Sequence, residues 1–285
     1  MRRISAIAGA LAVAIACLGT ASAASAARGS VRPGLPIIRD QGAGQAPTGA
    51  PTISLNWSGY VVQSPSKFKD VSSTFVQPAV TCNGVSPEAT SNWVGLDGYT
   101  NGTVEQTGTI ANCKGANDKT PVYKAWYEMF PAGSVNVFTV KPGDLMSVAV
   151  RYKNGKFHLK IADLTSGKSF KHSATCNSCQ RSSAEWIIER PAFCTNASCT
   201  HAVIGALPDF VTTKMNNAVA TAGSVSGSIS AFKNTPIEGV YNLSGSVNPG
   251  TDGFISVDTT GPLATSPSRF TMTWNRSGGT IPITL

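Results

Sequence analysis

Short runs in which apolar and polar residues alternate dominate the sequence. Residues 145–152 and 157–164 are two such runs, and they flank the dipeptide Asn154-Gly155. Alternation with a period of two places the apolar side chains on one face of a β-strand, and Asn-Gly favours a tight hairpin turn. The pattern therefore predicts two antiparallel strands joined by that turn.

The rest of the chain continues in the same style. Residues 254–257 and 270–274 repeat the strand pattern, whereas residues 213–222 come nearest to a helical period and match it weakly. Many short strands separated by turns rich in Gly, Ser and Asn favour an all-β fold, an antiparallel β-sandwich. We expect one such domain over residues 52–285.

One predicted strand, residues 184–189, carries two acids. In Ala-Glu-Trp-Ile-Ile-Glu, the side chains of Glu185, Ile187 and Glu189 share one face. The chain contains only 15 Asp and Glu residues, six of them Glu, so two glutamates in one apolar strand suggest a function. The alternative is an edge strand with one solvent-exposed face, and the strand alone leaves both interpretations open.

The two N-terminal segments differ from the rest in composition. Residues 1–27 combine two arginines with an apolar run over residues 4–18 and Ala-x-Ala cleavage sites, which is typical of a secretion signal. Cys17 gives a weaker match to a lipid-attachment site. Residues 28–51 are rich in Pro, Gly and Ala and are expected to be a linker or a short propeptide. We expect the mature protein to be extracellular.

The net charge of the chain is positive, but it does not by itself indicate an acidic partner. The net charge of +8 falls to +6 without residues 1–27, because the signal contains two of the 23 Lys and Arg residues and none of the 15 acids. The basic residues are scattered and match no nucleic-acid-binding motif. We therefore expect no nucleic-acid partner and, once the signal is removed, no membrane association. The mature protein is expected to be a monomer.

Six cysteines follow the predicted signal: Cys82, Cys113, Cys176, Cys179, Cys194 and Cys199. An even number in an exported protein favours disulfides over free thiols. Proximity in the sequence favours the local pairs Cys82–Cys113, Cys176–Cys179 and Cys194–Cys199. The nested alternative, Cys176–Cys199 with Cys179–Cys194, stays open. A four-thiolate zinc site is the less favoured interpretation of the last four.

The other reactive groups are few. The three histidines, His158, His172 and His201, stand in unrelated contexts without metal-ligand spacing, and no G-x-S-x-G motif is present. Each histidine is expected to be structural or at the surface. Carboxylates, amides and aromatic rings therefore remain as the candidate functional groups.

These groups concentrate in four short segments that contain three of the five tryptophans. The segments are Asn56-Trp57-Ser58-Gly59-Tyr60, Asn92-Trp93-Val94-Gly95-Leu96-Asp97-Gly98, Glu105-Gln106-Thr107-Gly108 and Ala125-Trp126-Tyr127-Glu128-Met129-Phe130-Pro131. A single tryptophan more often belongs to a core. Together with Glu189, the segments predict an aromatic cleft that contains a carboxylate and an amide.

In chain order, the motifs N-W-x-G, W-V-G-x-D-G, Q-T-G, A-W-Y-E and A-E-W-I-I-E resemble those of the glutamic peptidases, the eqolisins. The similarity runs from Asn56 to Arg190 and, more loosely, to the C-terminus. It implies a sandwich of two large antiparallel sheets, similar to concanavalin A and other lectins, with a polypeptide substrate across the concave face. It also implies a secreted endopeptidase that uses no metal or cofactor, works in acid and is insensitive to pepstatin.

The resemblance assigns roles residue by residue. The catalytic pair corresponds to Gln106 of Q-T-G and to Glu189, the last residue of A-E-W-I-I-E, whereas Glu185 is not catalytic. The supporting or substrate-binding positions correspond to Trp57, Trp93, Asp97, Trp126 and Glu128.

The pair fits this chemistry. A carboxylate can activate water as a general base and later return the proton to the leaving amine. An amide can donate a hydrogen bond to the oxyanion, and it keeps the same charge in acid. We expect an acidic but not extreme optimum, because the Lys and Arg residues repel one another once the acids are protonated. The alternative is a carbohydrate-binding or glycoside-hydrolysing sandwich, in which Glu189 and Glu128 would serve as the two acids.

Overall fold

The structure, a computed structural model, describes residues 29–39, 51–243, 253–266 and 268–285. The predicted secretion signal lies outside these residues. Within them the regular elements are strands and one 3-10 turn, η1 (Ile229–Ala231), and no helix is long and apolar enough to cross a membrane. The strands are β1 (Val31–Arg32), β2 (Thr52–Ser54), β3 (Trp57–Gln63), β4 (Phe68–Val76), β5 (Glu88–Leu96), β6 (Val104–Cys113), β7 (Pro121–Phe130), β8 (Val135–Thr139), β9 (Leu145–Lys153), β10 (Lys156–Asp163), β11 (Ser169–Ala174), β12 (Ser183–Glu189), β13 (Ala192–Cys194), β14 (His201–Ile204), β15 (Thr212–Ala222), β16 (Val225–Ser228), β17 (Lys233–Asn242), β18 (Phe254–Thr260), β19 (Phe270–Trp274) and β20 (Ile281–Thr284).

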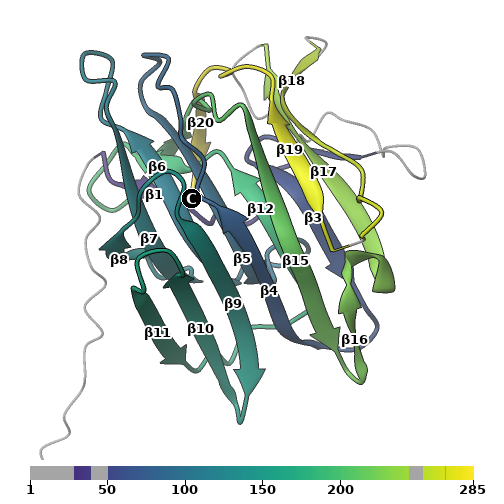
Figure 1. The fold of residues 1–285 in the computed structure, drawn as a ribbon. Coiled ribbons are helices and arrows are strands. Elements are labelled where there is room, and N and C mark those ends of the chain that lie inside the picture. Colours follow the sequence, from purple (N-terminus) through teal and green to yellow (C-terminus); the bar gives the residue numbers. More distant parts are fainter. Residues whose placement is uncertain (1–28, 40–50, 244–252, 267) are drawn as a thin grey trace, which may run out of the picture.

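Two large antiparallel sheets form the sandwich that the strand pattern predicted (Figure 1). One layer has the order β19-β18-β17-β3-β12-β5-β6-β7-β8, and the other has the order β11-β10-β9-β4-β15, with β16 beside β15. The long strand β15 belongs to both layers, because residues 212–215 pair with β19 and residues 216–222 pair with β4. The segment nearest to a helical period is therefore a strand that connects the layers.

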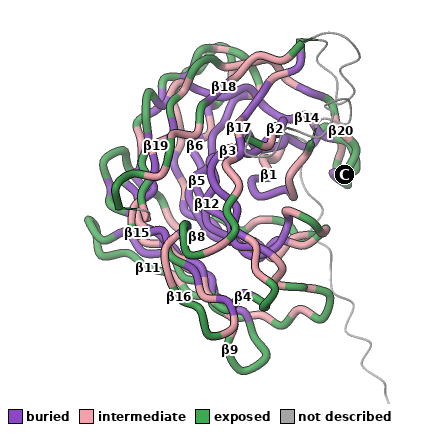
Figure 2. Tube along the Cα trace, turned by 90° about the vertical axis from the view of Figure 1, so that its right-hand side faces the viewer, coloured by how far each residue is buried: buried purple, intermediate pink, exposed green. Residues whose placement is uncertain are grey.

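Strand β12 lies in the middle of the first layer, between β3 and β5. All of its residues are buried, and buried positions follow β3, β5 and β12 through the interior (Figure 2). Trp186 and Ile188 face the core between the layers, whereas Ile187 packs with aromatic residues on the opposite face. Glu185 and Glu189 share that opposite face with Ile187. The alternative of an edge strand with a wet face is therefore wrong.

A smaller sheet has the order β1-β13-β14-β20. Its first strand belongs to the segment that the composition indicated as a linker or propeptide. Leu35 of that segment is only 2% exposed and packs with Ala192 and Ala202. Residues 29–39 are therefore packed against the domain and are not a free linker, although their composition shows little apolar patterning.

Three disulfides join the six cysteines: Cys82–Cys113, Cys176–Cys179 and Cys194–Cys199. This is the local pairing that sequence proximity favoured. The sulfurs are engaged with one another, so neither the nested pairing nor a four-thiolate zinc site describes this structure. Cys82–Cys113 ties the chain before β5 to the end of β6 and spans a sequence separation of 31.

We expect loss of the Cys82–Cys113 disulfide to cost more stability than loss of Cys176–Cys179, because their sequence separations are 31 and 3. The chain-entropy model of cross-links gives about 3.7 kcal/mol for the longer loop and about 1.6 kcal/mol for the shorter one. Urea unfolding of the two double Cys→Ala variants measures both losses. Equal losses would show that loop length does not set the contribution.

Candidate active site

Strands β12, β5, β6 and β7 are neighbours, and their register brings the predicted residues to one face. Gln106 of β6 lies between Gly95 of β5 and Glu128 of β7. Trp93 lies opposite Gly108, whose missing side chain matters because a Cβ there would overlap the Trp93 side chain. The glycine of the Q-T-G motif therefore lets β6 lie close to Asn92 and Trp93 of β5.

Glu189 is fully buried, and its carboxyl group accepts a hydrogen bond from Trp93 Nε1 at 2.9 Å. Burial raises the pKa of Glu189 to about 8, and hydrogen bonds from Gly34, Trp93 and Leu35 act in the opposite direction. In this covered state the group is therefore a weaker acid than an exposed glutamate.

A segment of the chain itself, residues 30–39, lies across this face. Gly34 N donates to Glu189 Oε2 at 2.5 Å, and Leu35 N donates to Glu189 Oε1 at 3.1 Å. On the other side, Gln106 Nε2 donates to the carbonyl oxygen of Gly34. The carboxyl group and the amide therefore hold opposite sides of the backbone around one peptide bond, Gly34–Leu35.

Gly34 allows this close contact because it has no side chain. Its φ of +85° is in the left-handed region, and a Cβ would overlap the amide of Gln106 and the carboxylate of Glu128. Pro33 and Pro36 flank the Gly34–Leu35 pair. Proline fixes φ, so the segment loses less conformational entropy when it is held.

Glu128 connects the amide to a cation. Its side chain is fully buried, and Gln106 Nε2 donates to its Oε2 at 2.9 Å. Arg32 Nη2 lies 3.4 Å from the other oxygen, Oε1. Burial raises the pKa of Glu128 well above its usual value; the charge of Arg32 opposes that shift, and the charge of Glu189 adds to it. Glu128 therefore orients Gln106 from the side away from Glu189.

The three tryptophans of the predicted cleft are buried but differ in what they contact. Trp57 Nε1 donates to the carbonyl oxygen of Leu35 at 2.8 Å, and its ring packs edge-on against Trp93 with centroids 5.1 Å apart. Trp126 Nε1 donates to Ser91 Oγ at 3.2 Å. Trp57 thus contacts residues 30–39 and Trp93 contacts the carboxyl group of Glu189, whereas Trp126 contacts Ser91 of β5.

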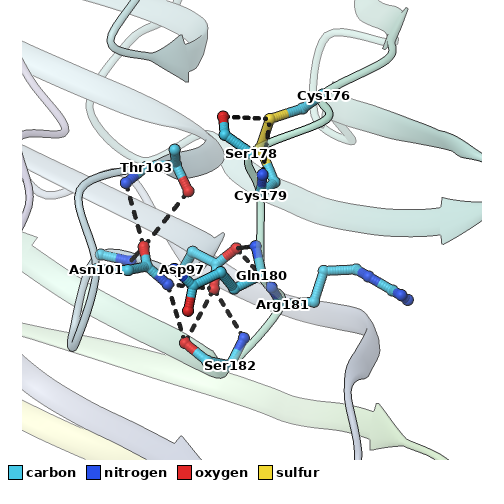
Figure 3. Close-up of a disulfide and its surroundings, with 10 residues drawn as sticks. Asp97, Asn101, Thr103, Cys176, Ser178, Cys179, Gln180, Arg181 and Ser182 are labelled. Atoms are coloured by element: carbon cyan, nitrogen blue, oxygen red, sulfur yellow. Dashed lines mark hydrogen bonds between the residues drawn. A yellow bond between two sulfur atoms is a disulfide. The ribbon is translucent and has the colours of Figure 1, made fainter.

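Asp97 lies just after β5 and contacts a loop (Figure 3). Its carboxylate accepts hydrogen bonds from the backbone N–H groups of Gln180, Arg181 and Ser182 at 2.8, 2.6 and 2.7 Å. Asn101 Nδ2 adds a fourth at 2.8 Å. Asp97 therefore supports the fold by fixing the loop before β12, and none of these contacts reaches the Gln106–Glu189 pair.

Two more buried acids, Glu185 and Glu105, lack a hydrogen bond of ordinary length to their carboxyl oxygens within the described part of the chain. Burial raises the pKa of Glu105 to about 9 and that of Glu185 well above its usual value, and the charge of Asp97 adds to both shifts. Residues 30–39 contact Glu189 and not Glu185. The sequence did not indicate Glu105 as a candidate, because the pattern of apolar and polar residues does not show that this acid is buried.

Comparisons with known proteins give the family and the fold. The model of the Peptidase A4 family matches residues 55–257. A crystal structure of scytalido-glutamic peptidase with a transition-state analogue inhibitor shares the fold, with a TM-score of 0.62 and 23% identity over 77% of this chain and 98% of that chain. SCP-B, a member of the eqolisin family in a complex with the tripeptide Ala-Ile-His, gives a TM-score of 0.61 and 22% identity over the same shares. No curated protein matches the sequence.

We expect the fold to be more stable in mild acid than above neutral pH. The folded pKa values of Glu105 and Glu189, about 9 and about 8, lie above those of the unfolded chain. The folded state therefore binds more protons than the unfolded state from about pH 4.5 upward, so this stability is complete below that pH and is lost as pH rises through the folded values.

Thermal unfolding of the wild type and of Glu185→Gln and Glu105→Gln between mild acid and alkaline pH measures the effect. Each amide replaces a group that resists ionisation, so each variant should lose less stability with rising pH than the wild type. Parallel pH profiles for all three proteins would show that these acids do not cause the dependence.

Proposed function

This chain belongs to the Peptidase A4 family, and on that premise we propose that it is a secreted glutamic endopeptidase in which Gln106 and Glu189 hydrolyse peptide bonds. The reaction uses no metal or cofactor, takes polypeptide substrates and proceeds in acid. The disulfides and the signal-like residues 1–27 support an extracellular location.

One observation carries the proposal: the pair already holds a peptide unit. The carbonyl oxygen of Gly34 accepts a hydrogen bond from Gln106, and the following amide nitrogen, that of Leu35, donates to Glu189. In hydrolysis, the first of these atoms becomes the oxyanion and the second becomes the leaving amine. The contacts therefore match the two positions at which a peptidase needs a donor and a proton carrier.

The reaction follows from these positions. The Glu189 carboxylate takes a proton from a water molecule, whose oxygen attacks the carbonyl carbon of the substrate. Gln106 Nε2 donates to the oxyanion of the tetrahedral intermediate, and Glu189 then transfers its proton to the leaving nitrogen as the C–N bond breaks. Gln106 Oε1 has no hydrogen-bond partner among the described residues and is suited to accept one from the attacking water.

The bound segment is an inhibitor in this scheme. Both oxygens of Glu189 are in direct contact with backbone N–H groups of Gly34 and Leu35, so no water lies between the carboxyl group and that backbone. Residues 28–51 then act as a propeptide, of which residues 30–39 cover the pair until the propeptide is removed. Removal also admits solvent to Glu189, which relieves the burial that raises its pKa.

The contacts of Glu128 favour a peptide over a saccharide as the ligand of the cleft. A glycosidase would need Glu128 as a second acid beside the scissile bond. Here Glu128 binds the amide of Gln106 and the guanidinium of Arg32 instead. The carbohydrate alternative therefore gains no observation in its favour.

We expect Glu189→Gln to lower turnover by at least about 100-fold, because the amide cannot relay the proton. Gln106→Ala should lose about 100- to 1000-fold through the missing oxyanion donor. Glu185→Gln is the matched control on the same strand and should keep most of its activity. Hydrolysis of denatured casein at about pH 4, with pepstatin and with a chelator, measures the rates, and circular dichroism verifies folding.

Activity lost in Glu185→Gln but kept in Glu189→Gln would exchange the roles of the two acids. Full activity in all three variants would rule out the pair. Inhibition by pepstatin or by the chelator would contradict the proposed class, and so would a pH optimum above neutrality.

We expect removal of residues 28–51 to activate the enzyme. A recognition site for a sequence-specific protease, placed within residues 40–50, lets the full chain fold before it is cut. The cut enzyme, separated from the segment, should be at least about 10-fold more active than the uncut one, since a filled cleft lowers the competent fraction.

Gly34→Ala in the uncut chain should raise activity as well, because its methyl group overlaps Gln106 and Glu128. Gly102→Ala, whose added methyl group meets nothing within 4 Å, is the control. If cutting leaves the activity of an otherwise competent enzyme unchanged, the segment is not an inhibitor.

A further inference from the structure

The disulfide Cys176–Cys179 differs from the other two in its exposure. It closes a short loop between β11 and β12, at one end of the sandwich (Figure 3). Both of its cysteines are partly exposed, whereas the cysteines of the other two disulfides are buried: Cys82, Cys113, Cys194 and Cys199. Access to solvent is the first requirement for a disulfide that reacts with an external thiol.

A hollow of about 470 Å³ lies beside Cys179. Among the described residues that line it are two cations, Lys67 and Arg181, and no acid. Neither cation belongs to a salt bridge within the described part of the chain. The Arg181 guanidinium is held 3.8 Å from the centre of the Tyr152 ring. A hollow with two unneutralised cations attracts a small anion to the wall that contains Cys179.

The sulfur of Cys176 receives the hydrogen bonds that stabilise a thiolate. Cys179 N donates to Cys176 Sγ at 3.1 Å. Ser178 Oγ lies 3.6 Å from the same sulfur and is the donor, because a disulfide sulfur has no hydrogen. Donors to the charged form lower the pKa of a thiol, and a thiol of lower pKa leaves faster in disulfide exchange. Cys176 is therefore the leaving sulfur, and Cys179, at the hollow, is the sulfur that is attacked.

A buried acid lies next to both sulfurs. A carboxyl oxygen of Glu105 and the sulfurs of Cys176 and Cys179 all lie within 4.8 Å of one another. Glu105 is fully buried, and neither of its oxygens has a hydrogen bond of ordinary length among the described residues. Burial, with a smaller contribution from the charge of Asp97, raises its pKa to about 9. Glu105 therefore carries a proton at neutral pH, and its pKa is close to the value of about 8.5 for an ordinary thiol.

Glu88 provides the contrast within the same fold. Its carboxyl group lies within the same distance of the sulfurs of Cys82 and Cys113. However, Glu88 accepts hydrogen bonds from the backbone N–H groups of Asn83 and Gly84, and that disulfide is buried. An acid without a hydrogen-bond partner and an accessible sulfur occur together at Cys176–Cys179 and not at Cys82–Cys113.

Both ends of the loop are held without the disulfide. Asp97 accepts hydrogen bonds from the backbone N–H groups of residues 180–182, and Ala174 pairs with Phe157 of β10. Opening of the bond therefore leaves the two sulfurs close together. The disulfide can then form again without a rearrangement of the fold, which makes the exchange reversible.

We propose that Cys176–Cys179 is a site of thiol–disulfide exchange with small acidic thiols, with Glu105 as its proton donor. This activity is separate from the Gln106–Glu189 pair. The thiolate of the acidic thiol attacks Cys179 Sγ and forms a mixed disulfide with it. The electron pair of the broken S–S bond goes to Cys176 Sγ, which takes the proton of Glu105, and solvent returns a proton to Glu105.

A second molecule of the thiol completes the reaction. Its thiolate attacks the sulfur of the first molecule in the mixed disulfide and releases Cys179 as a thiolate, which takes a proton from solvent. Two acidic thiols are thereby oxidised to one disulfide, and Cys176–Cys179 is reduced to two thiols.

Two thiols of equal length and opposite charge test the site on the uncut protein at neutral pH and low ionic strength. They are 2-mercaptoethanesulfonate, an anion, and cysteamine, a cation. A capped disulfide peptide of residues 174–180 is the reference, because it has the same bond without the hollow or Glu105. Each rate with the protein is divided by the rate of the same thiol with the peptide, which removes the intrinsic reactivity of the thiol.

The divided rate of the anionic thiol should exceed that of the cationic thiol by at least about 10-fold, and the anionic thiol should react faster with the protein than with the peptide. Alkylation followed by mass spectrometry should locate the thiol on Cys179. Equal divided rates would overturn the site. So would a mixed disulfide on Cys176, or a reaction with the protein that is slower than with the peptide.

Substitutions separate the hollow from the acid. Lys67→Gln and Arg181→Gln should each reduce the preference for the anionic thiol by about threefold. Lys69→Gln is the matched control, because Lys69 Nζ donates to the carbonyl oxygen of Gly223 and the residue does not line the hollow. An undiminished preference in both of the first two variants would overturn the role of the hollow.

Glu105→Gln should lower the rate with both thiols by at least about 10-fold and leave the preference between them unchanged, because the amide supplies no proton. An unchanged rate in the folded variant would overturn the role of Glu105. If the variant does not fold, the two wild-type rates and the position of the mixed disulfide still decide whether the site exists. Peptidase activity enters none of these measurements.

Discussion

The cost of placing carboxyl groups inside a β-sandwich governs this structure. Five of the six glutamates are buried: Glu88, Glu105, Glu128, Glu185 and Glu189. Each buried acid must either receive hydrogen bonds or keep its proton. Glu88 receives hydrogen bonds from Asn83 and Gly84, and Asp97 receives them from the loop before β12. Glu105 and Glu185 lack such donors at ordinary length among the described residues, and burial together with the charge of Asp97 raises their pKa values.

Glu189 and Glu128 differ from these acids because some of their partners belong to residues 30–39. Residues 30–39 supply two backbone N–H groups to Glu189 and a guanidinium to Glu128. The domain itself contributes Trp93 to the first acid and Gln106 to the second. Residues 30–39 therefore complete the hydrogen bonding of both acids.

Local patterns predicted much of this fold and little of what lies across the cleft. Alternation placed β9 and β10, because burial of one face leaves a period of two in the sequence. Strand β12 is buried on both faces, and its branched and aromatic residues indicated a strand instead. The crossing of β15 between the layers depends on distant partners and has no local signature. Residues 29–39 looked like a linker because a segment held by backbone contacts needs few apolar side chains. The motif resemblance indicated Gln106, Glu128 and Glu189, and all three contact residues 30–39 in the structure. Asp97, indicated as a supporting or substrate-binding position, contacts the loop before β12.

The conformation of Gly34 explains how the backbone of residues 30–39 comes so close to Gln106 and Glu189. Gly34 has no Cβ and a φ of +85°, so its backbone approaches Gln106 and Glu189 directly. A residue with a side chain at that position would overlap Gln106 and Glu128 and must lie farther out. The missing side chain of Gly34 thus lets this backbone contact the carboxyl group of Glu189 directly.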